Sequence, residues 1–141
     1  MKQSMKILFL FCLLAATRAG ATEILVTDPW IREAPPSVRT LAAYMTISNT
    51  STHAVGLESA TSDDFEMVDI HRTETQEGMS HMMKQTGLQI KGGENVRLEP
   101  GGYHLMLMQP RRHLQADDTI ILKLHFDNGE DISVAAVVRK Q

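Results

Sequence analysis

The sequence of 141 residues contains one cysteine, Cys12, which lies in an N-terminal segment that we expect to be removed. Cys12 is a poor site for lipid attachment, because Phe11 precedes it and the apolar run continues past it. The mature chain would then have no thiol, which excludes disulfide bonds and catalytic thiols. Zinc sites built on cysteine and blue-copper electron-transfer sites are excluded as well, because both require a cysteine thiolate.

Long hydrophobic runs are scarce. The apolar stretch at residues 7–16 follows two lysines and is too short to cross a bilayer, and Ala19-Gly20-Ala21 has the small-x-small pattern of a signal-peptide cleavage site. No later stretch approaches the ~20 apolar residues of a spanning helix. We therefore predict a secretory signal peptide at residues 1–21, export to the periplasm, and a single domain at residues 22–141.

An excess of basic residues is also absent. The chain has 14 Lys and Arg against 17 Asp and Glu, a net charge of −3, and removal of the signal peptide would leave 11 basic residues against the same 17 acidic ones. Binding to nucleic acid needs clustered lysine and arginine that contact phosphates. We therefore expect neither nucleic acid nor an anionic membrane surface to be a partner.

The mature sequence consists of short apolar segments separated by turn residues, and no segment sustains a helical period over three turns. Asp127-Asn128-Gly129-Glu130 is a strong hairpin signal, and residues 28–37, with three prolines, are expected to be extended. Short strands that recur about every 8–12 residues predict an all-β fold, an antiparallel β-sandwich or flattened barrel. The predicted strands are 41–48, 68–73, 79–85, 103–108, 119–126 and 132–138, with weaker candidates at 55–60 and 96–99.

Two histidines and two methionines form the most informative pattern in the chain. They are His71, Met82, His104 and Met106, spaced as H-x10-M-x21-H-x-M. Thioether sulfur is a soft, neutral ligand that binds Cu(I) well and binds zinc, magnesium or calcium poorly. Two imidazoles and two thioethers without a nearby thiolate therefore indicate a Cu(I) site.

The predicted strands can bring these four side chains together. A turn at Glu77-Gly78 would fold residues 79–85 back onto 68–73 and place Met82 roughly opposite His71, where opposed Cβ atoms lie ~5 Å apart. His104 and Met106 are two residues apart on one strand, so both point to the same face. A site for one metal ion at the end of a sandwich is the expected result.

Other roles remain open for the neighbouring residues. Asp69 shares a strand face with His71, where it either orients the imidazole or is a solvated carboxylate. Trp30 either covers the site or anchors the core. His81 is expected on the opposite face from Met82, together with Met79 and Met83, and would reach the metal only if the hairpin frays. Core packing is the expected role of Met45, Met67 and Met108, although Met108 could instead line the site.

The sequence also resembles the PCuAC family of periplasmic copper chaperones. The histidine and methionine spacing matches the metal pattern of that family across the mature chain. Further similarity lies in residues 28–32 (Asp-Pro-Trp-Ile-Arg), 34–36, 43–49, 68–71 and 101–108. One difference is Arg72-Thr73, at positions where many members have a methionine beside or soon after the first histidine.

The resemblance implies a cupredoxin-like β-sandwich that binds one Cu(I) with His71, Met82, His104 and Met106. It implies delivery of the metal to cytochrome c oxidase, chiefly to the binuclear centre of subunit II, alongside a Sco-type thiol chaperone. A monomer is expected. Some members also have a C-terminal tail rich in methionine and histidine, and the Arg139-Lys140-Gln141 end gives no such expectation here.

Three other functions compete with copper delivery. A sequestration or resistance protein would need the same site and would never pass the metal on. A structural exported sandwich domain would bind no stoichiometric copper. An enzyme is the weakest alternative, because the sequence has no H-E-x-x-H, nucleophile elbow, haem-attachment or G-x-G-x-x-G motif. A copper oxidase would require cycling between Cu(I) and Cu(II) at an open coordination position.

Overall fold

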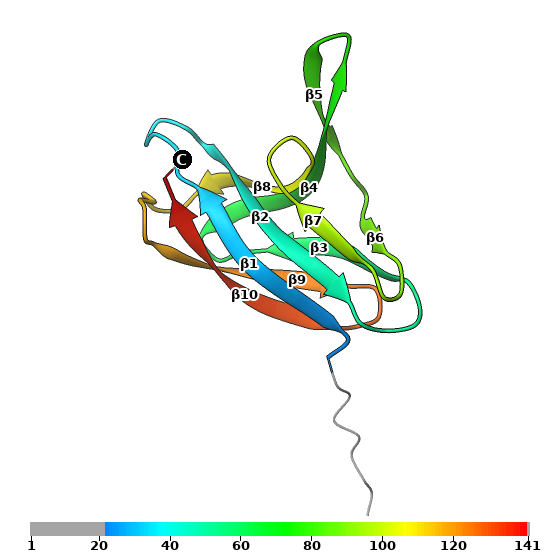
Figure 1. The fold of residues 1–141 in the computed structure, drawn as a ribbon. Coiled ribbons are helices and arrows are strands. Elements are labelled where there is room, and N and C mark those ends of the chain that lie inside the picture. The colour runs from blue at the N-terminus through cyan, green and yellow to red at the C-terminus, as the bar shows by residue number, and fades with distance from the viewer. Residues whose placement is uncertain (1–21, 141) are drawn as a thin grey trace, which may run out of the picture.

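The computed structural model describes residues 22–140, so the predicted signal peptide lies outside the described residues. All regular structure in this range is β-strand (Figure 1). Residues 22–140 contain no helix that is long and apolar enough to cross a membrane. The strands are β1 (Ile24–Arg32), β2 (Thr40–Asn49), β3 (Val55–Thr61), β4 (Phe65–Gln76), β5 (Met79–Lys84), β6 (Leu88–Ile90), β7 (Asn95–Leu98), β8 (Tyr103–Pro110), β9 (Thr119–Phe126) and β10 (Asp131–Arg139).

The ten strands form one hydrogen-bonded sheet with the order β5-β4-β8-β7-β2-β1-β10-β9-β3-β6, and β8 also pairs with β2. The pairs are antiparallel except for β1–β10 and a short β7–β8 contact. The sheet curls so that β3, from one half, contacts β4, from the other, although the two strands do not pair (Figure 1). The predicted all-β fold, a sandwich or flattened barrel, is confirmed.

Side-chain alternation explains how the core forms. In β9, Ile120, Leu122 and Leu124 are fully buried, whereas Ile121 between them is 52% exposed. Branched apolar residues at every second position suit a strand with one buried face. The buried residues of β9 and of the facing strands join in a single hydrophobic cluster. Burial of this cluster supplies the main driving force for the fold.

The first strand, β1, was not predicted from the sequence. Residues 28–37 were expected to be merely extended, yet β1 runs through Asp28 and Pro29, and its Ile31 is fully buried. A register shift between Thr27 and Trp30 and a positive φ of 48° at Asp28 mark a bulge there. Proline is tolerated within a sheet at such bulges, because its missing N–H is then not needed by the ladder. The three-residue strand β6 was missed as well, because it is too short to show a pattern.

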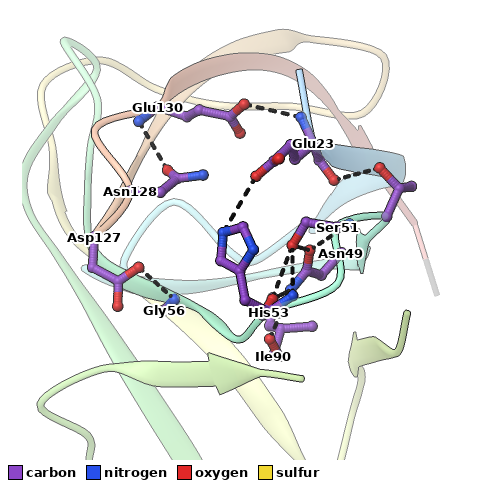
Figure 2. Close-up of polar contacts among 10 residues, drawn as sticks. Glu23, Asn49, Ser51, His53, Gly56, Ile90, Asp127, Asn128 and Glu130 are labelled. Carbon is purple, nitrogen blue, oxygen red and sulfur yellow. Dashed lines mark hydrogen bonds and ion pairs between the residues drawn. The ribbon is translucent and has the colours of Figure 1, made fainter. Parts of the chain in front are cut away.

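A polar network closes one end of the molecule (Figure 2). The buried side chain of Asn49 donates hydrogen bonds from Nδ2 to the carbonyl oxygens of His53 (2.8 Å) and Ile90 (2.9 Å). Its Oδ1 accepts from the hydroxyl of Ser51 at 2.7 Å. The exposed His53 imidazole lies 3.7 Å from Glu23, just before β1 begins. The candidate site lies near the other end of β1, at Arg32.

Candidate metal centre

Three of the four predicted ligands line one pocket. Met82, His104 and Met106 share an open pocket of about 230 Å³. The remaining lining residues come from β1, β2 and the loop between them, and are Arg32, Glu33, Ala34, Thr40, Leu41, Ala42 and Tyr44. The pocket opens on the outer face of β1, β2 and β8, because the inward-facing residues of β8, Leu105 and Leu107, are buried in the core.

The fourth predicted ligand lies beside this pocket. His71 of β4 is the direct cross-strand partner of His104 in β8, and their ring centroids are 5.9 Å apart. Asp69 pairs with Met106 in the same ladder, two residues further along. Opposed residues of an antiparallel pair point to one face, so His71 and Asp69 share the face of His104 and Met106. The two imidazoles thus approach each other directly.

Met82 is not opposite His71, as the sequence suggested, and this expectation was wrong by two residues. The two-residue turn has positive φ at Glu77 (51°) and Gly78 (79°), which sets the register so that Met82 pairs with Thr73. His71 pairs instead with Lys84. A shift of two residues keeps the side chain on the same face, since strand side chains alternate with a period of two. Met82 therefore lies diagonally from His71 and on its face, with 62% of its surface exposed.

The histidine in β8 is held more firmly than the rest of the site. His104 is only 4% exposed, and its Nδ1 lies 3.3 Å from the carbonyl oxygen of Gly102. A carbonyl can only accept, so this contact assigns the proton to Nδ1 and leaves the Nε2 lone pair free. Backbone contacts of this kind fix the tautomer and orientation of metal-binding histidines.

His71 contains a buried ring nitrogen without a partner. Its Nδ1 has no hydrogen bond, and its Nε2 lies 4.0 Å from a carboxylate oxygen of Asp69. Burial lowers the pKa of His71, the nearby His104 and Lys84 lower it further, and Asp69 acts in the opposite direction. A buried polar nitrogen left unpaired costs free energy unless it binds something. A neutral imidazole with a free lone pair is the form that coordinates metals.

The comparison with known proteins identifies the family. A family model described as "Putative lipoprotein LpqE-like" matches residues 24–138. The chain belongs to the LpqE-like family. It is 30% identical over 120 residues to "Putative lipoprotein Lxx21020" of Leifsonia xyli subsp. xyli, which covers 84% of this chain and 71% of that protein.

Several solved structures resemble this LpqE-like protein. The solution structure of Cu(I)-bound DR1885 from Deinococcus radiodurans is 32% identical, has a TM-score of 0.69, and covers 90% of this chain and 87% of its own. The copper-bound PCuAC domain from PmoF2 has a TM-score of 0.73 at 19% identity and covers 86% of this chain and 97% of its own. The second likeness concerns the fold alone.

Tyr44 is a site residue of the LpqE-like protein that sequence reasoning missed. It lines the pocket, and its ring centroid lies 6.4 Å from that of His104. Trp30 of β1 packs against Tyr44 with ring centroids 4.7 Å apart and planes tilted by 42°, so it supports the pocket wall without lining the pocket. Tyr44 can be recognised as a pocket residue only from the pairing of β2 with β8. This pairing places Ala42 opposite Met106, and Tyr44 is two residues from Ala42 on the same strand face.

Asp69 makes a closer contact than the one expected with His71. Its Oδ1 lies 3.0 Å from Nζ of Lys84, the residue that pairs with His71 across the β4–β5 ladder. The 4.0 Å between the second carboxylate oxygen and His71 Nε2 is too long for a hydrogen bond. The largely buried carboxylate of Asp69 therefore forms an ion pair with Lys84, and it acts to raise the pKa of His71 only through its charge.

The other methionines divide between core and surface. Met45 is 2% exposed, which confirms its predicted core role. Met67 is 52% exposed, so its predicted core role was wrong. Ile70 marks the core face of β4, and Met67, an odd number of residues away, points to the opposite face. Met108 is half-buried beside Met67 and does not line the pocket.

The lowered pKa of His71 predicts a measurable titration. In the metal-free protein, His71 should remain neutral at a pH where an unperturbed histidine, with a pKa of 6.5, is half protonated. Unfolding returns the group to its ordinary pKa, so the unfolded chain binds more protons and this group's contribution to stability falls as pH drops below about 6.5. NMR titration of the imidazole resonances measures the midpoint. In Asp69→Asn the midpoint should fall further, and a midpoint above 6.5 would contradict the burial argument.

Proposed function

We propose that this LpqE-like protein binds one Cu(I) through His71, Met82, His104 and Met106 and passes it to another protein. The observation that carries the proposal is the direct pairing of two imidazoles across β4 and β8, with two thioethers on the same face. Among residues 22–140, no group of three or more His, Cys, Asp or Glu side chains is placed to hold a metal. The sulfur atoms are thus the donors available beside the two rings.

The relatives support the choice of metal. DR1885, which is 32% identical over most of both chains, has a solved structure with Cu(I). The donor set agrees with this, because neutral thioethers favour Cu(I) over hard or borderline cations. The buried and unpartnered Nδ1 of His71 also fits a metal-binding residue, since coordination by a ring nitrogen would remove an unpaired polar atom.

The burial of the ligands supports delivery over storage. His104 is buried and hydrogen-bonded, whereas Met82 is mostly exposed on the edge strand β5. An incoming ligand from a partner can therefore displace the sulfur of Met82 first, with one metal–ligand bond formed as another breaks. The copper stays Cu(I) throughout, and only the imidazoles compete with protons for the site.

The recipient and the compartment are part of the same proposal. An LpqE-like lipoprotein family is consistent with an exported protein, and we place this chain in the periplasm. The proposed recipient is the copper centre of cytochrome c oxidase subunit II, directly or through a Sco-type chaperone. Oxidase activity in a deletion strain grown at limiting copper separates delivery, which predicts a loss, from sequestration, which predicts none.

The binding claim is tested by anaerobic loading of the purified protein with Cu(I). We expect one tightly bound copper per chain, and X-ray absorption should show both sulfur and nitrogen scatterers around it. In a competition titration at neutral pH, Zn(II) should fail to displace the copper, because thioethers are poor ligands for zinc. Absence of stoichiometric copper, a first shell without sulfur, or displacement by zinc would each reject the assignment.

A further inference from the structure

The edge strand β5 has soft donor atoms on both of its faces. Met82 faces the pocket with His104 and Met106. Met79, His81 and Met83 alternate with Met82 and therefore point to the opposite side of the hairpin. This second set, two thioethers on either side of an imidazole, has no part in the four-ligand pattern.

Core packing does not explain this second set. Every residue of β5 is exposed, with Met79 at 59% and Met83 at 50%. The β4–β5 hairpin extends beyond the body of the sandwich, and β5 is the terminal strand of the sheet (Figure 1). Proteins usually protect such edges with charged residues or proline, because an exposed apolar edge invites aggregation. Methionines that stay at least half exposed at this position lower solubility, and burial among residues 22–140 does not remove this cost.

The geometry of a strand allows the three side chains to share one ion. Residues two apart on one strand face are separated by about 6.7 Å, so His81 lies midway between the two methionines. Methionine has three rotatable bonds and a polarizable sulfur, so both side chains can lean toward a metal held above the imidazole. Glu74, the cross-strand partner of His81, lies on the same side, where its carboxylate is 3.5 Å from the guanidinium of Arg72 and is not counted as a ligand.

We propose that Met79, His81 and Met83 form a second, open Cu(I) site that loads the pocket. The metal would pass from Met83 to Met82, which are adjacent in sequence and on opposite faces, around the unpaired edge of β5. In this step a Cu–S bond to Met82 forms as the bond to Met83 breaks, and the copper remains Cu(I). Transfer of the copper to the pocket rests on the proposed function. Binding of Cu(I) by Met79, His81 and Met83 does not.

Ag(I), a redox-inert analogue of Cu(I), is the probe for the second site. The exported chain labelled with ¹³C at the methionine methyl groups is titrated with up to two equivalents of Ag(I). The first equivalent should shift the methyl signals of Met82 and Met106. The second should shift those of Met79 and Met83 and the ring signals of His81.

The variants separate the two sites. In the triple variant Met79→Leu, His81→Gln, Met83→Leu, affinity for the second equivalent should fall at least tenfold while the first changes less than twofold. The rate at which the pocket acquires Cu(I) from a chelate should also fall at least tenfold. Met67→Leu removes an equally exposed methionine outside the hairpin and should change neither quantity.

Three outcomes would overturn the proposal. These are Met79 and Met83 signals that do not move at two equivalents, a triple variant that keeps its second equivalent, and a loading rate that is unchanged in that variant. Each of them leaves the pocket site intact if the first equivalent still binds. Failure of the first equivalent, with Met82 and Met106 unmoved, would instead reject the proposed function, so the two failures are distinguishable.

Discussion

Replacing His71 and His104 together with alanine is expected to lower the affinity for Cu(I) by more than about 100-fold. The change removes both nitrogen donors and leaves two thioethers, so the loss should exceed the 10–100-fold typical of residues that merely orient ligands. A competition titration with a chromophoric Cu(I) chelator measures the dissociation constant. The matched control is His53→Ala with His113→Ala, which removes two exposed histidines away from the pocket and should leave the affinity unchanged.

A second variant separates binding from folding. His104 is buried, so its loss leaves a cavity and removes its contact with the carbonyl oxygen of Gly102, which still accepts from the N–H of Thr73. Met106→Leu keeps nearly the same volume, and such swaps usually cost less than about 1.5 kcal/mol of stability. It should still weaken Cu(I) binding, because leucine has no donor atom. Unchanged copper affinity in both this variant and the double histidine variant would refute the four-ligand site.

The largest expected effect on stability comes from β9. Ile120→Ala should reduce the free energy of unfolding by about 2–5 kcal/mol, because Ile120 is fully buried and its truncation leaves a cavity in the core. Ile121→Ala, one residue away on the exposed face, is the control and should cost less than about 1 kcal/mol, which reflects strand propensity alone. Urea unfolding of the metal-free protein measures both values. Equal losses would contradict the assignment of the core face.

Several strands and one turn were predictable, because their pattern is local. Alternating burial defines β9, and the Glu77-Gly78 turn between β4 and β5 lies where the sequence predicts it. The spacing of His104 and Met106 was sufficient to place both on one face, since strand side chains alternate strictly. The resemblance to PCuAC proteins added the fold type, which the TM-scores against solved domains confirm.

Register and pairing between distant strands were not predictable in the same way. The Met82 position was misplaced by two residues along β4, and β1 was hidden by Pro29 at its bulge. Met67 was assigned to the core because methionine is common there, but it is 52% exposed. The register of Met82 depends on the conformation of the two-residue turn. The pairing of β1 and the exposure of Met67 depend on strands farther away in sequence, which leave no local signal.

The sequence by itself determined the kind of donor atoms, the absence of thiols from residues 22–140, and a sheet with alternating faces. These depend on residue type and on the two-residue period of a strand. Only the tertiary structure decided that His71 meets His104 across β4 and β8, that Tyr44 lines the pocket beside His104, and that Met82 stays exposed. The reason is physical: such contacts form between strands that are brought together by burial of a shared core, and that burial is a property of the whole chain.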